Sequence, residues 1–180
     1  MPASNSHLPV LYHEIILALR PRREGYYVDG TLGAGGHAAG ILEASQPDGH
    51  LLGMDLDPQA ISIARQRLSP FGDRVTIVQA SYTSLREQLE KFGWQAVNGI
   101  LLDLGVSSMQ IDTPERGFSF QTEAPLDMRF DPANAVTADD LVNSLSENDL
   151  ADVIFRYGEE RRAYQVARAI VRARPVHGTI

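Results

Sequence analysis

Short apolar runs alternate with amphipathic stretches along the first hundred residues. The pattern predicts strands at 25–29, 50–55, 75–79 and 97–104 and helices at roughly 37–45, 58–69 and 83–91. Strands that are apolar almost throughout are typical of parallel sheets covered on both faces. The repeated strand-helix order therefore predicts an α/β fold whose crossover connections are right-handed.

The pattern changes after residue 104. Residues 105–136 hold prolines, glycines and aspartates without a sustained period, which predicts a long ordered loop. From Thr137 the sequence favours helices, because TADD and SEND are capping-box sequences and 159–174 is a long helical stretch. We therefore predict a domain at 1–104, holding the first four strands, and a loop and helical insertion at 105–180.

Composition narrows the class of protein. The chain has 180 residues, of which 43% are hydrophobic, so it can bury a real core. It has no cysteine, which excludes disulfides and thiolate metal sites and suits the cytoplasm. The apolar runs near the N-terminus are interrupted by His13 and Glu14, so neither a signal peptide nor a membrane span is expected.

The most distinctive local sequence is DGTLGAGGHAAG at 29–40, which has five glycines and follows an apolar strand directly. Such a loop between a parallel strand and a helix lies at the ligand-binding edge of a sheet. The G-x-G-x-x-A spacing permits NAD, but Asp29 would repel a pyrophosphate and attract an ammonium group, which favours S-adenosylmethionine. A tight turn without a ligand is the remaining alternative.

Acidic residues also end the second and fourth predicted strands. Asp55 can accept hydrogen bonds from both hydroxyls of a ribose, and Asp103 lies at the same sheet edge. Asp57 precedes Pro58 and is expected to cap a helix. These carboxylates are therefore expected to surround one cleft.

Longer blocks carry a resemblance to a known family. They are HLPVL (7–11), DGTLGAGGH (29–37), DLDPQAI (55–61), ILLDLGVSSMQID (100–112), RGFSF (116–120), PLDMRFDP (125–132) and YGEERRA (157–163). Together they resemble the MraW-type family of ribosomal RNA small subunit methyltransferases. The resemblance implies a Rossmann-like, S-adenosylmethionine-dependent enzyme that methylates N4 of a cytidine in 16S ribosomal RNA.

The family pattern assigns a cofactor set by position. It comprises Gly35, Gly36, His37, Asp55, Tyr82, Asp103 and Gln110. Without the resemblance, Tyr82 reads equally well as an ordinary half-buried aromatic, and Gln110 as a solvated loop amide.

The sequence does not identify the residue that would accept a hydrogen bond from the target amine during methyl transfer. Many enzymes that methylate amino groups carry a D/N-P-P-Y-like motif after the fourth strand, whereas this chain has DLGV. Asp103, Asp127 and Arg129 are candidates, and an internal ion pair that shapes the loop is an equally good reading of the last two. The target base is expected to leave its stack to reach the cleft.

The C-terminal region supplies a candidate RNA surface. From Arg156 onward there are six arginines and two glutamates, although the whole chain carries −7. Arg168 and Arg172, one helical turn apart, are predicted to contact 16S ribosomal RNA, with a solvated helix face as the alternative.

This chain is shorter than the usual member of the family that it resembles. Its members usually continue into further strands, so we expect a truncated chain with an incomplete sheet. The run at 100–104 would then be an open edge that promotes self-association, with little methyl transfer. An NAD-dependent oxidoreductase and an inactive cofactor-binding fragment are the alternative functions.

Overall fold

The structure is a computed structural model that describes residues 9–179. The first two residues of the HLPVL block lie outside this range. Two compact units divide the chain, with the boundary between Gly105 and Val106, and each is described by itself.

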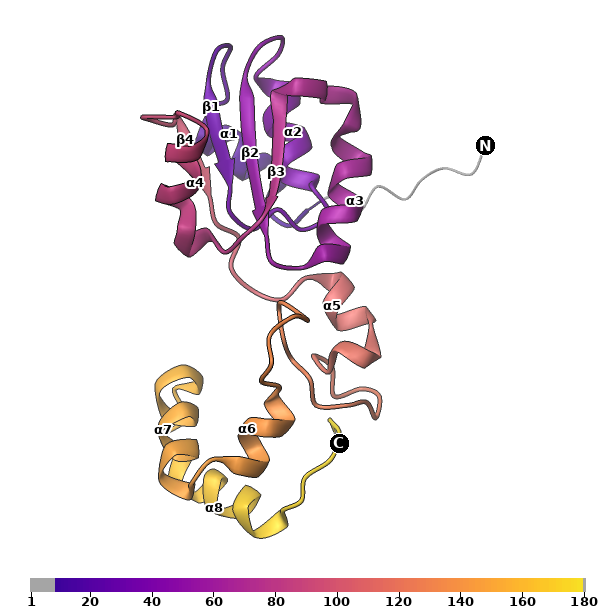
Figure 1. Ribbon diagram of the computed structural model, residues 1–180, viewed down its shortest axis with the longest axis vertical. Helices are drawn as coiled ribbons and strands as arrows, with labels where there is room; N and C mark the ends of the chain where they lie inside the picture. Colours follow the sequence, from indigo (N-terminus) through magenta and orange to yellow (C-terminus); the bar gives the residue numbers. More distant parts are fainter. Residues whose placement is uncertain (1–8, 180) are drawn as a thin grey trace, which may run out of the picture. The chain divides into compact units, whose positions relative to one another are not determined.

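The first unit is built on a four-stranded parallel sheet (Figure 1). Its strands are β1 (Tyr26–Asp29), β2 (His50–Asp55), β3 (Val75–Gln79) and β4 (Gly99–Leu101). Their order is β3-β2-β1-β4, and each neighbouring pair is parallel. The predicted α/β class is confirmed.

Helices cover both faces of this sheet. They are α1 (Tyr12–Leu19), α2 (Gly36–Ala44), α3 (Pro58–Leu68) and α4 (Leu85–Lys91), with 3-10 turns η1 (Ser69–Arg74) and η2 (Tyr82–Ser84). Tyr27 and Leu51 pack with α1, α2 and α3, whereas Val28 and Leu52 pack with α4. Successive strand residues point to opposite faces, so both faces require apolar residues. The sequence analysis did not predict α1.

The fourth strand is shorter than predicted. The predicted run at 97–104 forms a strand only at Gly99–Leu101, and Leu102 and Leu104 are 44% and 65% exposed. The reason lies in the pairing, because β4 pairs with β1 and β1 ends at Asp29, opposite Leu101. The residues after Leu101 therefore have no ladder partner within the described chain.

The second unit is helical. It contains α5 (Ser108–Asp112), η3 (Pro114–Arg116), α6 (Ala138–Ser144), α7 (Glu147–Gly158) and α8 (Ala163–Ala173). The predicted caps are present, since Thr137 and Ser146 accept hydrogen bonds at the starts of α6 and α7. Helices α7 and α8 pack through Leu150, Ala151 and Ala167.

Two predictions for this unit are wrong in extent. The loop expected at 105–136 contains α5 and η3, because Ser107 and Gln110 form a capping box. The helix expected at 159–174 begins at Ala163, since Glu159 adopts a left-handed conformation (φ 51°) after α7. Within the described range, no helix is both long and apolar enough to cross a membrane.

Candidate functional site

The glycine-rich loop joins β1 to α2 in the first unit. Gly33 and Gly35 have φ values of 52° and 78°, which few other residues adopt without strain. Gly35 is the N-cap of α2, so the loop turns the chain directly into that helix. The loop therefore brings backbone N–H groups and a helix start to the carboxyl end of the sheet.

Asp55 holds this loop in place. Its Oδ2 accepts a hydrogen bond from the Gly33 N–H at 2.7 Å, and its Oδ1 accepts one from the Asp57 N–H at 2.9 Å. Asp57 in turn accepts from the Gln59 N–H at 2.9 Å and caps α3, as predicted. Each carboxylate oxygen of Asp55 keeps a further lone pair, so the predicted ribose contact is compatible with these bonds.

Asp29 lies at the end of β1 and is only 1% exposed. Its Oδ1 accepts a hydrogen bond from the Thr31 N–H at 3.2 Å. Burial raises the pKa of Asp29 to about 7, and the charges of Asp55 and Asp103 act in the same direction. The Thr31 hydrogen bonds lower this pKa but do not offset the burial.

Strand register explains why the three aspartates act together. Asp29 lies opposite Gly53 of β2 and Leu101 of β4, so Asp55 and Asp103 each come two residues beyond its partners. Side chains two residues apart along an extended chain point to the same face. The register places Asp55 on the same face as Asp29, and the charges of Asp55 and Asp103 both act on the Asp29 carboxyl. We call these three residues the acidic corner (Asp29, Asp55 and Asp103).

Thr31 links two members of the acidic corner. Its hydroxyl oxygen accepts a hydrogen bond from the Asp103 N–H at 2.8 Å, while its own N–H donates to Asp29. The sequence analysis missed this residue. The signal was present, because Asp-Gly-Thr is a sequence in which an aspartate binds the N–H two residues ahead.

His37, on the first turn of α2, is 7% exposed. Neither ring nitrogen has a hydrogen-bond partner among residues 9–179, and Nε2 lies 3.8 Å from Asp103 Oδ2. Burial lowers the pKa of His37, and the Asp103 carboxylate opposes that effect. A buried imidazole without hydrogen bonds is costly, which is typical of a site that a ligand completes.

Tyr82 lies on η2, after β3, and is 41% exposed. Its Cβ would be 3.0 Å from a Cβ built on Gly30, so η2 lies close to the start of the glycine-rich loop. The structure thus brings Tyr82 to the same edge of the sheet as the loop. Two surface hollows along α3, both lined by Arg65, include none of the predicted cofactor residues.

Gln110 belongs to the second unit and has a local structural role. It is buried, its N–H donates to Ser107 Oγ at 3.2 Å, and its Oε1 accepts from the Ser107 N–H at 3.0 Å. This capping box stabilises the start of α5. Gln110 is therefore not the solvated loop amide of the alternative reading, and its cofactor role stays a prediction.

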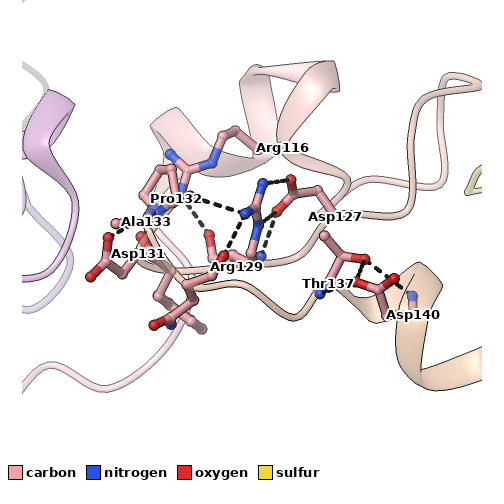
Figure 2. Close-up of polar contacts among 10 residues, drawn as sticks. Arg116, Asp127, Arg129, Asp131, Pro132, Ala133, Thr137 and Asp140 are labelled. Atoms are coloured by element: carbon pink, nitrogen blue, oxygen red, sulfur yellow. Dashed lines mark hydrogen bonds and ion pairs between the residues drawn. The ribbon is translucent and has the colours of Figure 1, made fainter. Parts of the chain in front are cut away.

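Asp127 and Arg129 form the ion pair that the sequence allowed, as Figure 2 shows. Arg129 Nε and Nη2 donate to the two Asp127 oxygens at 2.9 and 2.6 Å. Arg129 Nη1 donates to the carbonyls of Pro132 and Asn134, and Arg116 donates to the Arg129 carbonyl. This loop cluster (Arg116, Asp127 and Arg129) holds the chain between η3 and α6, and Arg129 lowers the pKa of Asp127.

The two predicted RNA-binding arginines lie on α8. Arg168 Nε donates to Glu147 Oε1 at 3.1 Å, and its guanidinium lies over the Tyr164 ring at 5.5 Å. Arg172 is exposed one turn further along the helix. Arg168 is therefore already engaged in packing α8 against α7, which favours a structural role for that residue beside the predicted one.

A family model and the curated relatives both place this chain in one family of methyltransferases. The model of the MraW methylase family matches residues 4–179. The ribosomal RNA small subunit methyltransferase H of Geotalea uraniireducens (strain Rf4) is 56% identical over 168 residues, which are 93% of this chain and 54% of that protein. The protein of the same name from Geotalea daltonii is 55% identical over 172 residues, which are 96% of this chain and 55% of that protein.

The chain thus spans about half the length of the curated relatives it matches. Among solved structures, the C-terminal domain of precorrin-6Y C5,15-methyltransferase from Rhodobacter capsulatus aligns with a TM-score of 0.45 and 18% identity. That alignment covers 57% of this chain and 52% of the other.

Proposed function

The chain belongs to the MraW methylase family, and from this premise we propose that it is the cofactor-binding part of a 16S ribosomal RNA methyltransferase. The proposed reaction transfers a methyl group from S-adenosylmethionine to N4 of a cytidine. The observation that supports it best is the convergence of the glycine-rich loop, the acidic corner and the unpartnered His37 at one edge of the sheet. The relatives named above are themselves methyltransferases of the small subunit RNA.

The described residues fit this cofactor chemically. The glycine-rich loop allows close approach of a ligand, Asp55 retains lone pairs for ribose hydroxyls, and Tyr82 offers a half-exposed ring for the adenine. The cofactor supplies an electrophilic methyl group on a sulfonium, whose positive charge suits an acidic corner. Gly35, Gly36, His37 and Gln110 complete the proposed set by family pattern.

The task of the protein is to position a weakly nucleophilic amine in line with that methyl group. An acceptor that takes a hydrogen bond from the amine would increase its nucleophilicity and receive its proton. Of the three candidates, Asp127 and Arg129 bind each other, whereas the Asp103 carboxylate is exposed at the sheet edge. We therefore favour Asp103 as the acceptor. Its backbone N–H, held by Thr31, would fix its position.

Binding measurements test the cofactor assignment. Titration calorimetry with S-adenosylmethionine, S-adenosylhomocysteine and NAD should show tighter binding of the first two. Asp55→Ala should weaken that binding by about 1.5–3 kcal/mol, the scale of hydrogen bonds to a charged group. Asp48→Ala, at an exposed carboxylate that binds Arg23 and the Glu24 N–H, is the control. Equal or tighter NAD binding would support the oxidoreductase alternative instead.

A transfer assay addresses the reaction itself. The radiolabelled methyl group should pass to small-subunit RNA, and the modified base should be N4-methylcytidine. Cofactor binding without transfer by the 180-residue chain would support the inactive-fragment alternative. A protein that methylates ribosomal RNA works where ribosomes are made, so we propose a cytoplasmic location.

The RNA surface is tested by salt dependence. Replacing Arg168 and Arg172 with glutamine should weaken binding to small-subunit RNA and reduce the salt slope, because fewer counterions are released. Arg23→Gln, an exposed arginine of the first unit, is the control. An unchanged slope would show that the α8 arginines are only solvated or, for Arg168, only structural.

Self-association through the sheet edge is a further part of the proposal. Leu102 and Leu104 are exposed beyond β4, and exposed apolar residues at a sheet edge promote pairing with other chains. Light scattering should show association that Leu102→Lys with Leu104→Lys reduces. Leu17→Lys, at a residue of α1 that is 73% exposed, should have no such effect. A monodisperse monomer before any substitution would contradict this part.

A further inference from the structure

Asp29 is a buried acid that has no positively charged partner in the part of the chain that the structure describes. The two charges that act on its carboxyl, those of Asp55 after β2 and Asp103 after β4, are both negative. The hydrogen bonds it accepts come from Thr31, a neutral residue. Ionising all three carboxyls of the acidic corner would bring like charges together at a site shielded from water, which is unfavourable.

His37 gives a second, independent sign that the acidic corner is incomplete. Its ring is buried on α2, and no described residue forms a hydrogen bond with either nitrogen. Nε2 faces Asp103 Oδ2 at 3.8 Å. That separation is too long for a hydrogen bond. A ligand that enters between the glycine-rich loop and the acidic corner would give these groups their missing partners.

We propose that a positively charged ligand group enters the acidic corner in exchange for one proton, which leaves Asp29 for the solvent. Asp29 then selects a cationic ligand over a neutral one of similar shape. The inference rests on the proposed function, because S-adenosylmethionine carries both a sulfonium and an ammonium group. It adds to that function a coupling between cofactor affinity and pH.

The energetic reason is an exchange of charges. Burial raises the pKa of Asp29 to about 7, so the unliganded protein holds a proton there under mildly acidic conditions. A cation beside the carboxyl favours its ionised form and lowers that pKa. Binding therefore releases the proton to the buffer. The net charge of the acidic corner rises by the charge of the ligand and falls by one unit for the lost proton. The titratable groups that neighbour Asp29 in the acidic corner are Asp55 and Asp103, and His37 faces Asp103.

Calorimetry can count the protons. S-adenosylmethionine would be titrated into the 180-residue chain in buffers that differ in ionisation enthalpy, all containing a metal chelator. At pH 6 we expect a release of about 0.9 proton, decreasing to about 0.5 at pH 7 and further above it, as a group with a pKa near 7 requires. The affinity should rise by about tenfold per pH unit between pH 5.5 and 6.5 and level off above pH 7. Adenosine, which carries neither cation, should bind without releasing a proton.

Matched variants assign the proton. Asp29→Asn keeps the shape and the acceptor for Thr31, and it should abolish both the release and the pH slope. Asp112→Asn, at an exposed residue of the second unit, should change neither. If Asp29→Asn does not fold, titrating the unaltered chain with S-adenosylmethionine and with adenosine still tests whether proton release requires a cationic ligand.

The outcomes separate this inference from the proposed function. Binding of S-adenosylmethionine without proton release, or equal release with adenosine, would overturn the exchange and leave the cofactor assignment intact. Release that persists in Asp29→Asn would overturn the assignment to Asp29. No binding of S-adenosylmethionine at any pH would contradict both.

Discussion

Asp29 and Asp127 are the same side chain in opposite surroundings. Asp29 is buried beside two carboxylates, and its pKa is raised to about 7. Asp127 receives two hydrogen bonds from the Arg129 guanidinium, and its pKa is lowered. Each aspartate lies in a region that sequence analysis marked as functional.

The contrast indicates what each region does. In the loop cluster every strong polar group shown in Figure 2 has a partner from the same segment, so the cluster stabilises the loop by itself. In the acidic corner the charges are alike, and the His37 ring has no hydrogen-bond partner among the described residues. A satisfied cluster holds structure, whereas an unsatisfied one is typical of a binding site.

The largest expected effect is a gain in stability from removing the Asp29 charge. Asp29→Asn should stabilise the unliganded first unit by roughly 3–4 kcal/mol at pH 7, since each pKa unit corresponds to about 1.4 kcal/mol. An acid with a raised folded pKa costs stability as the pH rises from about 4 to about 7. The gain should therefore grow over that window and stay constant above it.

Urea unfolding followed by the fluorescence of Trp94 measures this effect. Trp94 is the single tryptophan and packs against the buried cluster of Val28, Leu52 and Met54. A variant that is less stable than the unaltered chain at pH 7 would show that Asp29 is compensated in the free protein. Asp29 would then be compensated in the folded protein, as Asp127 is, and the two aspartates would not differ in this respect.

The next effect has the opposite sign and concerns the loop cluster. Arg129→Gln leaves Asp127 without its cation and should destabilise the loop, because both guanidinium hydrogen bonds to the Asp127 carboxylate are lost. Asp127 has a lowered folded pKa, so its contribution is present above about pH 4 and is lost as the pH falls through that lowered value. The difference between the two proteins should therefore vanish in acid.

Amide hydrogen exchange at Met128 and Ala138 reports on this loop, since both amides donate to carbonyls within it. Faster exchange in Arg129→Gln at pH 7 is the expected result. Unchanged exchange would mean that the carbonyl contacts and the ion pair are dispensable, and that Arg129 is available for another role.

A smaller effect is expected at Thr31, which joins Asp29 to Asp103. Thr31→Val removes the hydroxyl that accepts the Asp103 N–H and should weaken cofactor binding by about 1 kcal/mol, or roughly fivefold. Thr31→Ser retains the hydroxyl and should restore the affinity. If Thr31→Val and Thr31→Ser bind the cofactor with the same affinity, the Thr31 hydroxyl does not position Asp103.

The smallest effect should come from the exposed pair of Arg23 and Asp48, whose side chains are 70% and 40% exposed. Arg23→Gln should change the stability of the first unit by less than about 0.5 kcal/mol in urea unfolding, because surface ion pairs are screened. A cost as large as that of Arg129→Gln would show that an exposed pair stabilises this chain as much as the loop cluster does.

Several local signals were read correctly, although the capping box that begins α5 was missed. The positions of β1, β2 and β3, the cap of α3 by Asp57 and the caps at Thr137 and Ser146 were all predicted. Errors arose where a partner lies elsewhere. The fourth strand ends at Leu101 because β1 ends at Asp29, and the apolar run beyond it contains no sign of that limit.

The sequence alone determined the α/β class, the glycine-rich loop and the acids that end the strands, because periodicity and turn chemistry act over short distances. Only the tertiary structure decided what those acids do. Register placed Asp55 and Asp103 two residues beyond the partners of Asp29, and burial raised the pKa of Asp29. Packing left His37 without a hydrogen-bond partner within residues 9–179. Charge-charge interaction and desolvation depend on which distant segments meet, and that is fixed only when the sheet assembles.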